Sequence, residues 1–376
     1  MKLGLFFSKC ISLEIWYKKG LATREFKIYN ELYSNGELSE LHLFTYGSGD
    51  QEYLNKLMSE GVIGDYVNLH EMPKIFDNKL GKRIYQLILP FNNKIIKDID
   101  ILKTNQLDGS LAALLSKLLY RKKLYVRTGY SLITFMKNQK RYPWVYFWEL
   151  IERIALKYCD IASAASIADL DEWKNKGVDD KKLKWLPNFI DEKDFKPQSN
   201  INERKDRIVF IGRLNEQKNL ENILIACERT NVEIDVYGEG ELGEELKTRF
   251  SDTRIIRFKG KVDNSKVPEI LSKYKYYILC SLYEGTPKTL LEAMFCEVYT
   301  ITSNRPGINL ISKFGGTICD GVEHIEIEKG IIDAKKISNE DYSELVSKTR
   351  NEVANIYSLR NVTKVEQKIY QLLSDI

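Results

Sequence analysis

Short apolar runs alternate with longer amphipathic stretches along the whole chain. Each apolar run holds four to six residues, a length that favours buried strands over helices. In the first half the predicted strands are Lys2–Phe7, Leu41–Tyr46, Ile101–Gln106, Leu124–Thr128, Ile161–Ser166 and Leu183–Leu186. In the second half they are Arg207–Gly212, Glu233–Tyr237, Ile255–Phe258, Tyr276–Ser281 and Val298–Ser303.

Several stretches between these runs repeat apolar residues every three or four positions, which predicts helices. They include Thr23–Tyr33, Ser110–Leu119, Leu220–Glu228 and Glu241–Arg249. Repeated alternation of strand and helix predicts an α/β fold with parallel sheets and helices on both faces. Such sheets bind ligands beyond the carboxyl ends of their strands, so paired domains are expected to face each other across a cleft.

The length of 376 residues exceeds the roughly 250–300 residues at which a single core stops growing. The pattern restarts after the polar stretch 186–206, which contains Pro187 and Pro197 and is interpreted as an interdomain linker. We therefore predict two Rossmann-like domains, 1–187 and 188–354, and a final amphipathic helix within 355–376.

Composition excludes some classes of protein. The six cysteines lie far apart, mostly in apolar runs, which favours reduced thiols over disulfides or a zinc site. With three histidines, a histidine-rich metal centre is not expected. The opening MKLGLFF is too short for a signal peptide, and no run of about 18 apolar residues could span a bilayer. We expect a cytoplasmic protein.

The most informative local feature is a strand-to-helix junction bracketed by Glu284 and Glu292. Thr286 suits the N-cap and Pro287 the first helical position. The first-turn N–H groups of Lys288 and Thr289 should then point out of the carboxyl end of a strand, which favours a phosphate. A carboxylate beside a phosphate is repulsive unless it has another task, such as accepting hydrogen bonds from sugar hydroxyls.

A second candidate site follows the predicted strand that ends at Gly212. Arg213 and Lys218 come next in the sequence, and two cations at this position could hold a diphosphate by charge-assisted hydrogen bonds. An isolated Arg/Lys pair is more often a pair of solvated surface charges, but its position after a buried strand favours the site. Gly238 and Gly240 end the next strand and would let the backbone approach a ligand closely, although strand-to-helix turns use glycine anyway.

Taken in order, GRLNEQKN, VYGEGEL, FKGKV, SLYEGTPKTLLEAM and NRPGI resemble the retaining glycosyltransferases of family 4, which have the GT-B architecture. Glu284 and Glu292 match the family's E-x7-E motif. The resemblance covers the C-terminal half; in the other half, LPNFIDEKDF is similar to the family's interdomain segment and WYKKGLATRE to its first glycine-bearing loop. TNQLDGSLAALL and VRTGY resemble a subgroup of bacterial surface-polysaccharide transferases.

The resemblance implies a role for each matching residue. Arg213 and Lys218 would bind the donor diphosphate and stabilise its charge as it departs. Glu284 would bind donor-sugar hydroxyls and act with these cations in catalysis, and Glu292 would bind the nucleotide ribose. The other implied donor-binding residues are Gly20, Gly212, Gly238, Gly240, Pro287, Lys288, Thr289 and Leu290. The last helix would cross back onto the N-terminal domain.

The chain departs from the family at three places. Many members have a histidine that contacts the donor sugar where this chain has Thr128. Arg127, Thr128 and Tyr130 are therefore candidates for the sugar or acceptor pocket, with structural roles as the alternative. The small turn usual after EAM is replaced by residues 295–299, and Asn309 stands where many members have glutamate.

Metal and nucleic-acid binding are not expected. Asp98-Ile99-Asp100 spells DxD, the metal-diphosphate motif of the other major transferase architecture, but it precedes a predicted strand and is interpreted as a polar loop. We predict no metal and no cofactor, with a nucleotide-diphosphate sugar as co-substrate. No recognised nucleic-acid-binding module is present.

An anionic membrane surface is a possible partner of residues 121–148. Residues 101–150 contain nine lysines and arginines against two acidic residues, and several aromatic residues follow the basic ones. This mixture suits a membrane interface. Alternatively, the aromatic residues belong to the core of a long helix and only the lysines are exposed.

Together these features predict a metal-independent retaining glycosyltransferase of hexosyltransferase type that uses a nucleotide sugar and acts on a glycan, expected to be lipid-linked, at the inner membrane face. Two alternatives stay open. An epimerase on the same fold would release its product, and a non-catalytic subunit would bind nucleotide sugars without turnover.

Overall fold

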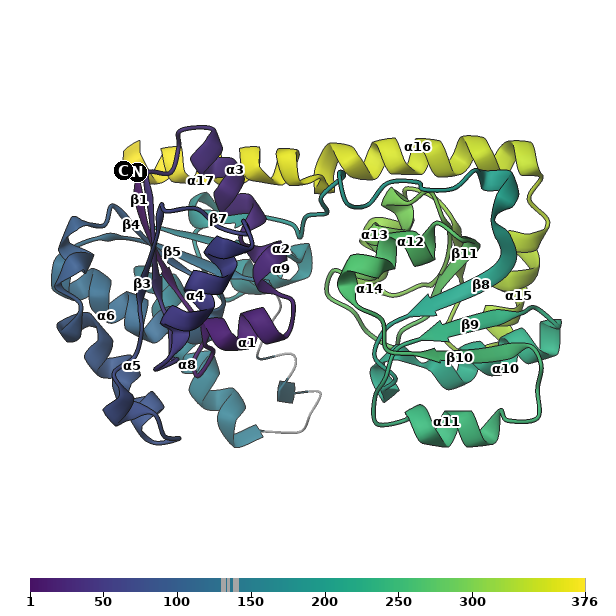
Figure 1. Ribbon diagram of the computed structural model, residues 1–376, viewed down its shortest axis with the longest axis horizontal. Coiled ribbons are helices and arrows are strands. Elements are labelled where there is room, and N and C mark those ends of the chain that lie inside the picture. The colour runs from purple at the N-terminus through teal and green to yellow at the C-terminus, as the bar shows by residue number, and fades with distance from the viewer. Residues whose placement is uncertain (130–132, 134–135, 138–141, 376) are drawn as a thin grey trace. The chain divides into compact units, whose positions relative to one another are not determined.

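The computed structural model describes residues 1–129, 133, 136–137 and 142–375 (Figure 1). The chain divides into two compact units. Unit 1 comprises Met1–Pro187 and Val362–Ile376, and unit 2 comprises Asn188–Asn361. The expectation of a cleft between the two units stays a prediction.

Unit 1 is built on a seven-stranded parallel sheet in the order β3-β2-β1-β4-β5-β6-β7. All described neighbours run parallel, for example Leu3 beside Leu41 and Ile101. The strands are β1 Lys2–Phe6, β2 Glu40–Phe44, β3 Val67–His70, β4 Ile101–Thr104, β5 Lys123–Thr128, β6 Ile161–Ala164 and β7 Leu183–Trp185.

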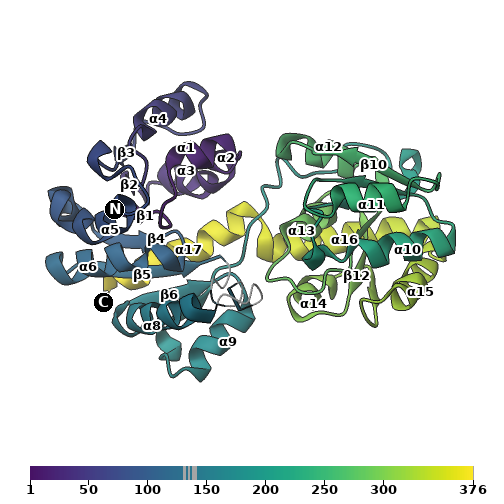
Figure 2. The same ribbon diagram turned by 90° about the horizontal axis from the view of Figure 1, so that it is seen from below.

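Helices connect successive strands of unit 1, as parallel pairing requires. Helices α5, α6 and α8 pack side by side, α6 against both neighbours (Figure 2). The helices are α1 Leu13–Lys18, α2 Ala22–Glu25, α3 Lys27–Ser34, α4 Asp50–Ser59, α5 Gly81–Asn92, α6 Ser110–Tyr120, α8 Tyr142–Tyr158 and α9 Ile167–Asn175.

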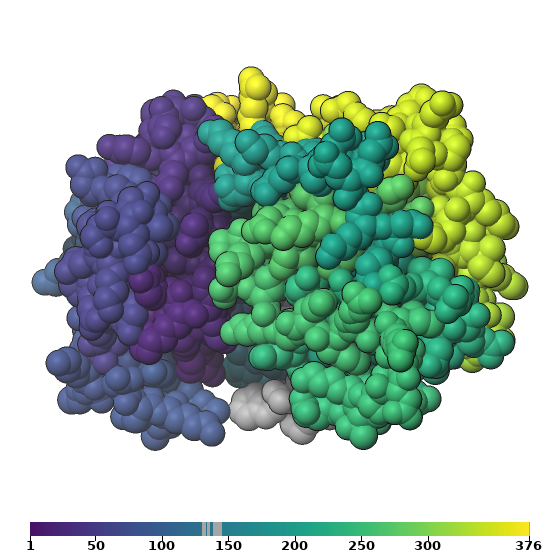
Figure 3. All heavy atoms as spheres, turned by 45° about the vertical axis from the view of Figure 1, so that its right-hand side comes forward, coloured from purple at the N-terminus to yellow at the C-terminus, as the bar shows by residue number. Residues whose placement is uncertain are grey.

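Unit 2 has a six-stranded parallel sheet in the order β10-β9-β8-β11-β12-β13. Its strands are β8 Lys205–Ile211, β9 Ile234–Tyr237, β10 Ile256–Gly260, β11 Tyr274–Leu279, β12 Tyr299–Ser303 and β13 Thr317–Cys319. Its helices are α10 Leu220–Thr230, α11 Gly243–Arg249, α12 Val267–Leu271, α13 Lys288–Phe295, α14 Pro306–Ser312, α15 His324–Lys335 and α16 Asn339–Tyr357. In space-filling view the yellow-green helices and the green and teal segments of unit 2 form one packed body (Figure 3).

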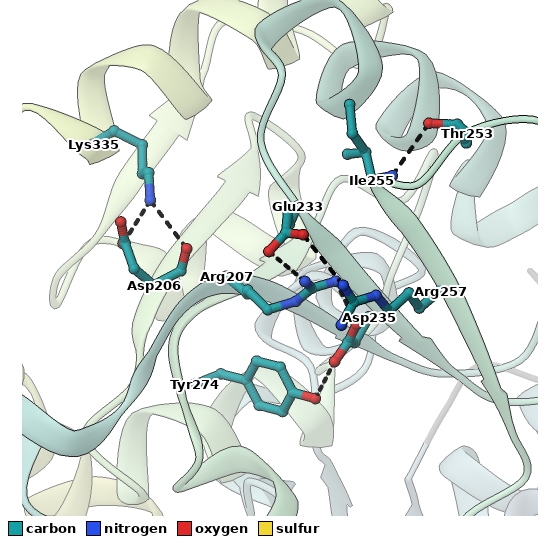
Figure 4. A network of polar contacts seen from close by, with 9 residues as sticks. All are labelled: Asp206, Arg207, Glu233, Asp235, Thr253, Ile255, Arg257, Tyr274 and Lys335. Atoms are coloured by element: carbon teal, nitrogen blue, oxygen red, sulfur yellow. Dashed lines mark hydrogen bonds and ion pairs between the residues drawn. The ribbon is translucent and has the colours of Figure 1, made fainter.

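A buried polar cluster joins three strands of unit 2 (Figure 4). Arg207 on β8 donates to Asp235 on β9 at 2.7 Å, and Asp235 accepts a second bond from the Tyr274 hydroxyl on β11 at 2.5 Å. Burial raises the pKa of Tyr274 far above its ordinary value, and the Asp235 carboxylate adds to the shift. Because each buried charge is paired, the cluster fixes strand register away from the carboxyl ends.

The last helix, α17 Leu359–Asp375, returns to unit 1. Its Glu366 is buried and forms an ion pair with Lys103 on β4, and it also accepts from the Tyr370 hydroxyl (2.5 Å). Lys103 Nζ lies 4.8 Å from the ring centre of Tyr29 and 5.5 Å from that of Tyr125. The sequence-based expectation that the final helix crosses back is confirmed.

The structure differs from the predicted elements where local signals were weak. The edge strands β3 and β13 were not predicted, because they are short and only partly buried. The single helix predicted at Thr23–Tyr33 is two helices, interrupted at the fully buried Phe26. All six cysteines are free and five are buried, as predicted. Among the described residues, no helix is long and apolar enough to cross a bilayer.

Candidate active site

The predicted donor-site residues of unit 2 lie at the carboxyl edge of its sheet. Strand order reverses between β8 and β11, which are neighbours in the sheet although not consecutive in sequence. Gly212 and Arg213 directly follow β8, and Glu284 lies in the loop after β11. Such a reversal leaves a crevice beyond the strand ends, where open α/β sheets bind ligands.

Lys218 and Glu284 meet at this point as an ion pair. Their side chains are 15% and 9% exposed, so the pair is largely removed from water. Two further bonds join the same loops: Leu282 N–H donates to the Gln217 carbonyl at 2.9 Å, and the Gln217 side-chain amide donates to Tyr283 at 3.0 Å. The structure thus brings together two residues that lie 66 positions apart in sequence.

Arg213 is exposed at the end of β8, in the loop that leads to Lys218. Within the described part of the chain, no hydrogen bond or ion pair to its side chain is found. A guanidinium at a strand end can turn toward an anion and bind it through two parallel N–H groups. Arg213 and Lys218 therefore differ: one cation is accessible and the other is already paired.

Asn219 fixes Lys218 in place, and the sequence analysis missed it. Asn219 is buried in left-handed conformation, with φ 53°, between a short 3₁₀ turn (Glu216–Lys218) and α10. Its side-chain amide donates to the carbonyls of Cys280 at 3.1 Å and Val322 at 2.7 Å. These bonds tie the turn that carries Lys218 to the end of β11. The signal in the sequence is that asparagine adopts this conformation more readily than most residues.

Helix α13 begins one residue later than predicted. Pro287 is its N-cap, with φ −69° and ψ 109°, and Lys288 is the first helical residue, so the assignment of Thr286 as N-cap was wrong. The extended ψ of Pro287 places it outside the helix. The first-turn N–H groups of Lys288, Thr289 and Leu290 still have no acceptor four residues earlier within α13. Their partial positive charge lies after β11, as an anion site needs.

Glu292 lies on α13, half-buried, about one turn from the helix start. The Tyr277 hydroxyl on β11 donates to Thr289 Oγ1 at 2.8 Å. Burial raises the pKa of Tyr277 well above its ordinary value, and the Glu284 and Glu292 carboxylates add to that rise. Both predicted carboxylates are therefore close enough to this buried phenol to raise its pKa.

Close backbone packing explains two glycines at this edge. Gly238, after β9, has φ 143°, and a Cβ there would lie 1.8 Å from the Gly212 carbonyl oxygen. At Gly307, in the first turn of α14, a Cβ would lie 2.1 Å from the Glu284 carbonyl oxygen. Gly307 belongs to the NRPGI motif but was not predicted as a site residue. Gly240 packs against Leu214 in the same region.

The candidates in unit 1 are less closely gathered. Gly20 follows α1 with φ 64°, and no heavy atom lies within 4 Å of where its Cβ would be. Arg127 and Thr128 end β5, and the Gly129 N–H donates to Gln106 at 2.7 Å. Burial would lower the pKa of Arg127, but Glu25 and Glu366 raise it above its ordinary value. Tyr130 lies outside the described residues.

Asp108 is a further candidate that the sequence analysis did not select. Strand order in unit 1 reverses between β1 and β4, and Asp108 follows β4 in a short 3₁₀ turn. Its Oδ1 is buried without a hydrogen-bond partner among the described residues. Burial raises the pKa of Asp108 to about 6, against the smaller opposing effect of Ser8. It lies within the TNQLDGS stretch, so the motif pointed to the segment but not to this residue.

The described residues contain no group of three His, Cys, Asp or Glu side chains placed to hold a metal ion. Asp100 of the DxD sequence accepts from the Lys2 N–H at 2.7 Å. It immediately precedes β4, which places it at the amino edge of the sheet, opposite the edge where such sheets bind ligands.

Comparison with known proteins connects this geometry to a family. Residues 191–352 match the family model described as "Glycosyl transferases group 1". The chain is 30% identical, over 42% of its length, to a Campylobacter jejuni alpha-1,4-N-acetyl-D-galactosaminyltransferase whose name includes a diphosphate-undecaprenol-linked glycan. It is 28% identical, over 53% of its length, to an Escherichia coli UDP-Gal:alpha-D-GlcNAc-diphosphoundecaprenol alpha-1,3-galactosyltransferase. These alignments span 44% and 56% of the two relatives.

Solved structures extend the similarity to the whole chain. HepE from Anabaena in complex with UDP superposes with a TM-score of 0.73, at 14% sequence identity and full coverage of both chains. Similarity at this identity shows the fold. Residues 191–352 are thus similar to the group 1 glycosyl transferases, and the chain as a whole has the GT-B fold of two parallel-sheet α/β domains.

Proposed function

We propose that this protein is a metal-independent retaining glycosyltransferase of hexosyltransferase type, which moves a sugar from a nucleoside-diphosphate donor to a lipid-linked glycan acceptor. The observation that carries the proposal is the Lys218–Glu284 pair, at the reversal of strand order and beside the first turn of α13. The names of the relatives, with their undecaprenol-linked glycans, support the acceptor class. We place the reaction at the cytoplasmic face of the inner membrane.

In this proposal unit 2 binds the donor. Arg213, Lys218 and the first-turn N–H groups of α13 hold the diphosphate, while Glu284 accepts hydrogen bonds from the sugar and Glu292 from the ribose. The pairing of Lys218 with Glu284 supports these roles, because a carboxylate beside a phosphate needs a nearby cation to offset the repulsion. Gly212, Gly238 and Gly240 let the backbone approach the nucleotide closely.

The chemical step needs stabilisation of a leaving diphosphate more than it needs a protein base. As the bond from the anomeric carbon to the diphosphate oxygen breaks, negative charge grows on that oxygen, and fixed cations lower the barrier. The departing oxygen then accepts the proton of the acceptor hydroxyl that attacks on the same face. In unit 1, Gly20, Arg127, Thr128 and Tyr130 are proposed to line the sugar or acceptor pocket.

The first test is a thermal-shift panel of nucleotide sugars, because a ligand that binds only the folded state raises its melting temperature. One nucleotide sugar should stabilise the wild type, and Lys218→Ala should abolish that shift. Lys335→Ala is the matched control: Lys335 is also ion-paired in unit 2, to Asp206 at 2.5 Å, but Asp206 lies at the start of β8, at the other edge of the sheet.

The donor identified in this way is then supplied with undecaprenyl-diphosphate glycans, and the products are followed by mass spectrometry. Transfer with retained anomeric configuration supports the proposal. Release of an isomerised nucleotide sugar would instead identify an epimerase, and donor binding without turnover on any acceptor would identify a binding subunit. Transfer that depends on an added divalent cation would contradict metal independence.

A further inference from the structure

One face of α5 is apolar and exposed to solvent. Leu80, Ile84, Leu87 and Phe91 are spaced four, three and four residues apart, which places them on one side of the helix. Leu87 is 49% and Phe91 63% exposed. The opposite side of α5 packs into the core through Tyr85 and Leu89, which are buried. An apolar stripe this long is not needed to fold unit 1, because the core is already covered.

The neighbouring helices of the same layer continue this surface. Helix α6 packs between α5 and α8 (Figures 1 and 2). Large apolar side chains are exposed on both neighbours, Leu118 on α6 and Tyr146 and Leu150 on α8. The Tyr120 hydroxyl donates to the Pro90 carbonyl at 2.8 Å, which ties the end of α6 to α5. The exposed apolar residues of α5, α6 and α8 are here called the docking face. Exposed apolar surface that spans several elements is typical of an interaction site.

Basic residues surround the docking face. Residues 79–123 contain ten lysines and arginines against three aspartates. Three of the ten are ion-paired with acids outside this range, Lys82 with Asp77, Lys117 with Asp160 and the buried Lys103 with Glu366, so the excess of basic residues comes from the others. Lys79 is exposed beside Leu80, and Lys94 is exposed just beyond α5. At the other end of the layer, Arg153 and Lys157 of α8 line a hollow of about 390 Å³ together with Lys182, Asp179 and Lys176, the last of which is paired with Glu152 and Glu172. The acidic Glu149 of α8 is paired with Lys137 at 2.9 Å. The charge around the apolar surface is therefore positive.

We propose that the docking face binds an anionic lipid bilayer. Apolar side chains at the centre and cations around them match the acyl boundary and the negatively charged headgroups of such a bilayer. The same charge disfavours a second copy of the chain, because a symmetric dimer would bring the basic residues of two copies together. The tendency to bind a bilayer belongs to unit 1 alone and does not depend on the donor chemistry of unit 2.

The docking face also reaches the edge of the sheet where ligands bind. Each helix of the layer leads back from the carboxyl end of one strand to the amino end of the next, so its first turn lies at the carboxyl edge. Leu80 directly precedes α5, and Asp108 lies two residues before α6. If the proposed function holds, an acceptor anchored in the bilayer would be presented to this edge without leaving the membrane.

Vesicle co-sedimentation of the purified full chain tests the proposal. We expect binding to phosphatidylcholine vesicles that contain phosphatidylglycerol, and weak binding to phosphatidylcholine alone. The double variant Leu87→Gln/Phe91→Gln should reduce binding about tenfold or more, because it removes two apolar groups from the interface. Ile332→Gln is the matched control: Ile332 is 47% exposed, on α15 of unit 2, and its substitution should change nothing.

The charged residues are tested separately. Lys79→Glu/Lys94→Glu should weaken binding to the anionic vesicles and make it less dependent on salt, because part of the electrostatic attraction is removed. Lys348→Glu on α16, also exposed, should change neither. Equal binding of the wild type to neutral and anionic vesicles would overturn the role given to the basic residues. A dimer in sedimentation velocity that the Leu87/Phe91 variant dissolves, without vesicle binding by the wild type, would overturn the proposal in favour of a second copy.

Failure of this proposal can be told apart from failure of the proposed function. Donor-induced thermal stabilisation reports on unit 2 and should be the same in the wild type and in the docking-face variants. Transfer to a water-soluble acceptor analogue should likewise be retained, whereas transfer to an acceptor embedded in vesicles should fall. A variant that loses donor stabilisation is misfolded and is replaced by the single substitution Leu87→Gln.

Discussion

In both units strand order reverses between two central strands, β1 and β4 in unit 1 and β8 and β11 in unit 2. A glycine packs closely at each of these edges: a Cβ on Gly109 would lie 2.7 Å from the Phe7 carbonyl oxygen, and one on Gly238 would lie 1.8 Å from that of Gly212. The chemistry differs. Unit 2 places Arg213 and the paired Lys218 at its edge, whereas unit 1 places the carboxyl of Asp108 there.

Under the proposed function, this difference would let one fold serve two ligands. Cations and helix first-turn N–H groups suit a diphosphate. A carboxyl group that burial keeps partly protonated suits a neutral, hydroxyl-rich partner such as a sugar. The fold supplies two edges at which strand order reverses, and under the proposed function a few side chains would decide which partner each edge takes.

The largest effect is expected at the close contact in unit 2. Gly238→Ala should cost about 4 kcal/mol or more of folding stability, because its Cβ cannot fit beside the Gly212 carbonyl and alanine is strained at this φ. Thermal unfolding would measure the loss. Gly285→Ala is the control, since no atom lies within 4 Å of its Cβ position. Equal melting temperatures for the two variants would show that the β8–β9 contact is not tight.

The next largest effect is expected for the charged residues of the candidate donor site. Lys218→Ala, Arg213→Ala and Glu284→Ala should each reduce transfer about 100-fold or more, the usual cost of removing one group that stabilises a leaving oxyanion. Lys218→Ala also leaves a nearly buried carboxylate unpaired, so Lys218→Ala/Glu284→Gln is included to separate stability from catalysis. Wild-type turnover in any folded variant would exclude that residue from the donor site.

A substitution of Asp108 is expected to raise folding stability, whereas the substitutions above lower stability or transfer. Its pKa is raised from 3.8 to about 6, so the folded state favours the protonated form. The contribution of the protonated Asp108 carboxyl to folding stability is fully present below its ordinary pKa of 3.8. It is lost as the pH rises through the folded-state pKa of about 6. Asp108→Asn should therefore stabilise the protein by about 2 kcal/mol at pH 8 and by little at pH 3.5.

If Asp108 serves the acceptor, the same Asp108→Asn variant should bind the donor normally while its acceptor KM rises. A gain in stability with unchanged kinetics would show that Asp108 lowers folding stability and takes no part in acceptor binding.

The smallest effect is expected on the folding stability at low pH, and it should come from unit 1 and not from unit 2. His42 Nδ1 lies 2.9 Å from His70 Nε2 in unit 1, and burial lowers the pKa of His70 from 6.5 to about 4. The folded state thus favours neutral His70, and stability is lost as the pH falls from 6.5 toward 4. In His70→Gln, the free energy of unfolding lost between pH 6.5 and pH 4 should be smaller by about 1–2 kcal/mol, as measured by denaturant titration. His324→Gln in unit 2 is the control and should leave the decline unchanged.

Local signals in the sequence were enough to predict the fold class and to locate charged residues that follow strand ends. Lys218 and Glu284 were identified in this way. Asn219 was not, because its acceptors, Cys280 and Val322, are distant in sequence. The raised pKa of Asp108 likewise comes from burial by other segments. Pro287 shows the limit of a local rule: it suits the first helical position, yet its ψ leaves it outside α13.

The return of α17 to unit 1 has a consequence for how the chain folds during synthesis. Unit 2 is continuous in sequence and can fold as soon as Asn361 has left the ribosome. Unit 1 cannot complete its structure until Glu366 follows, because Lys103 has no compensating carboxylate before then. The first half of the chain is thus finished last, so a ribosome that stalls near residue 360 would release a protein with a formed second domain and an open first one.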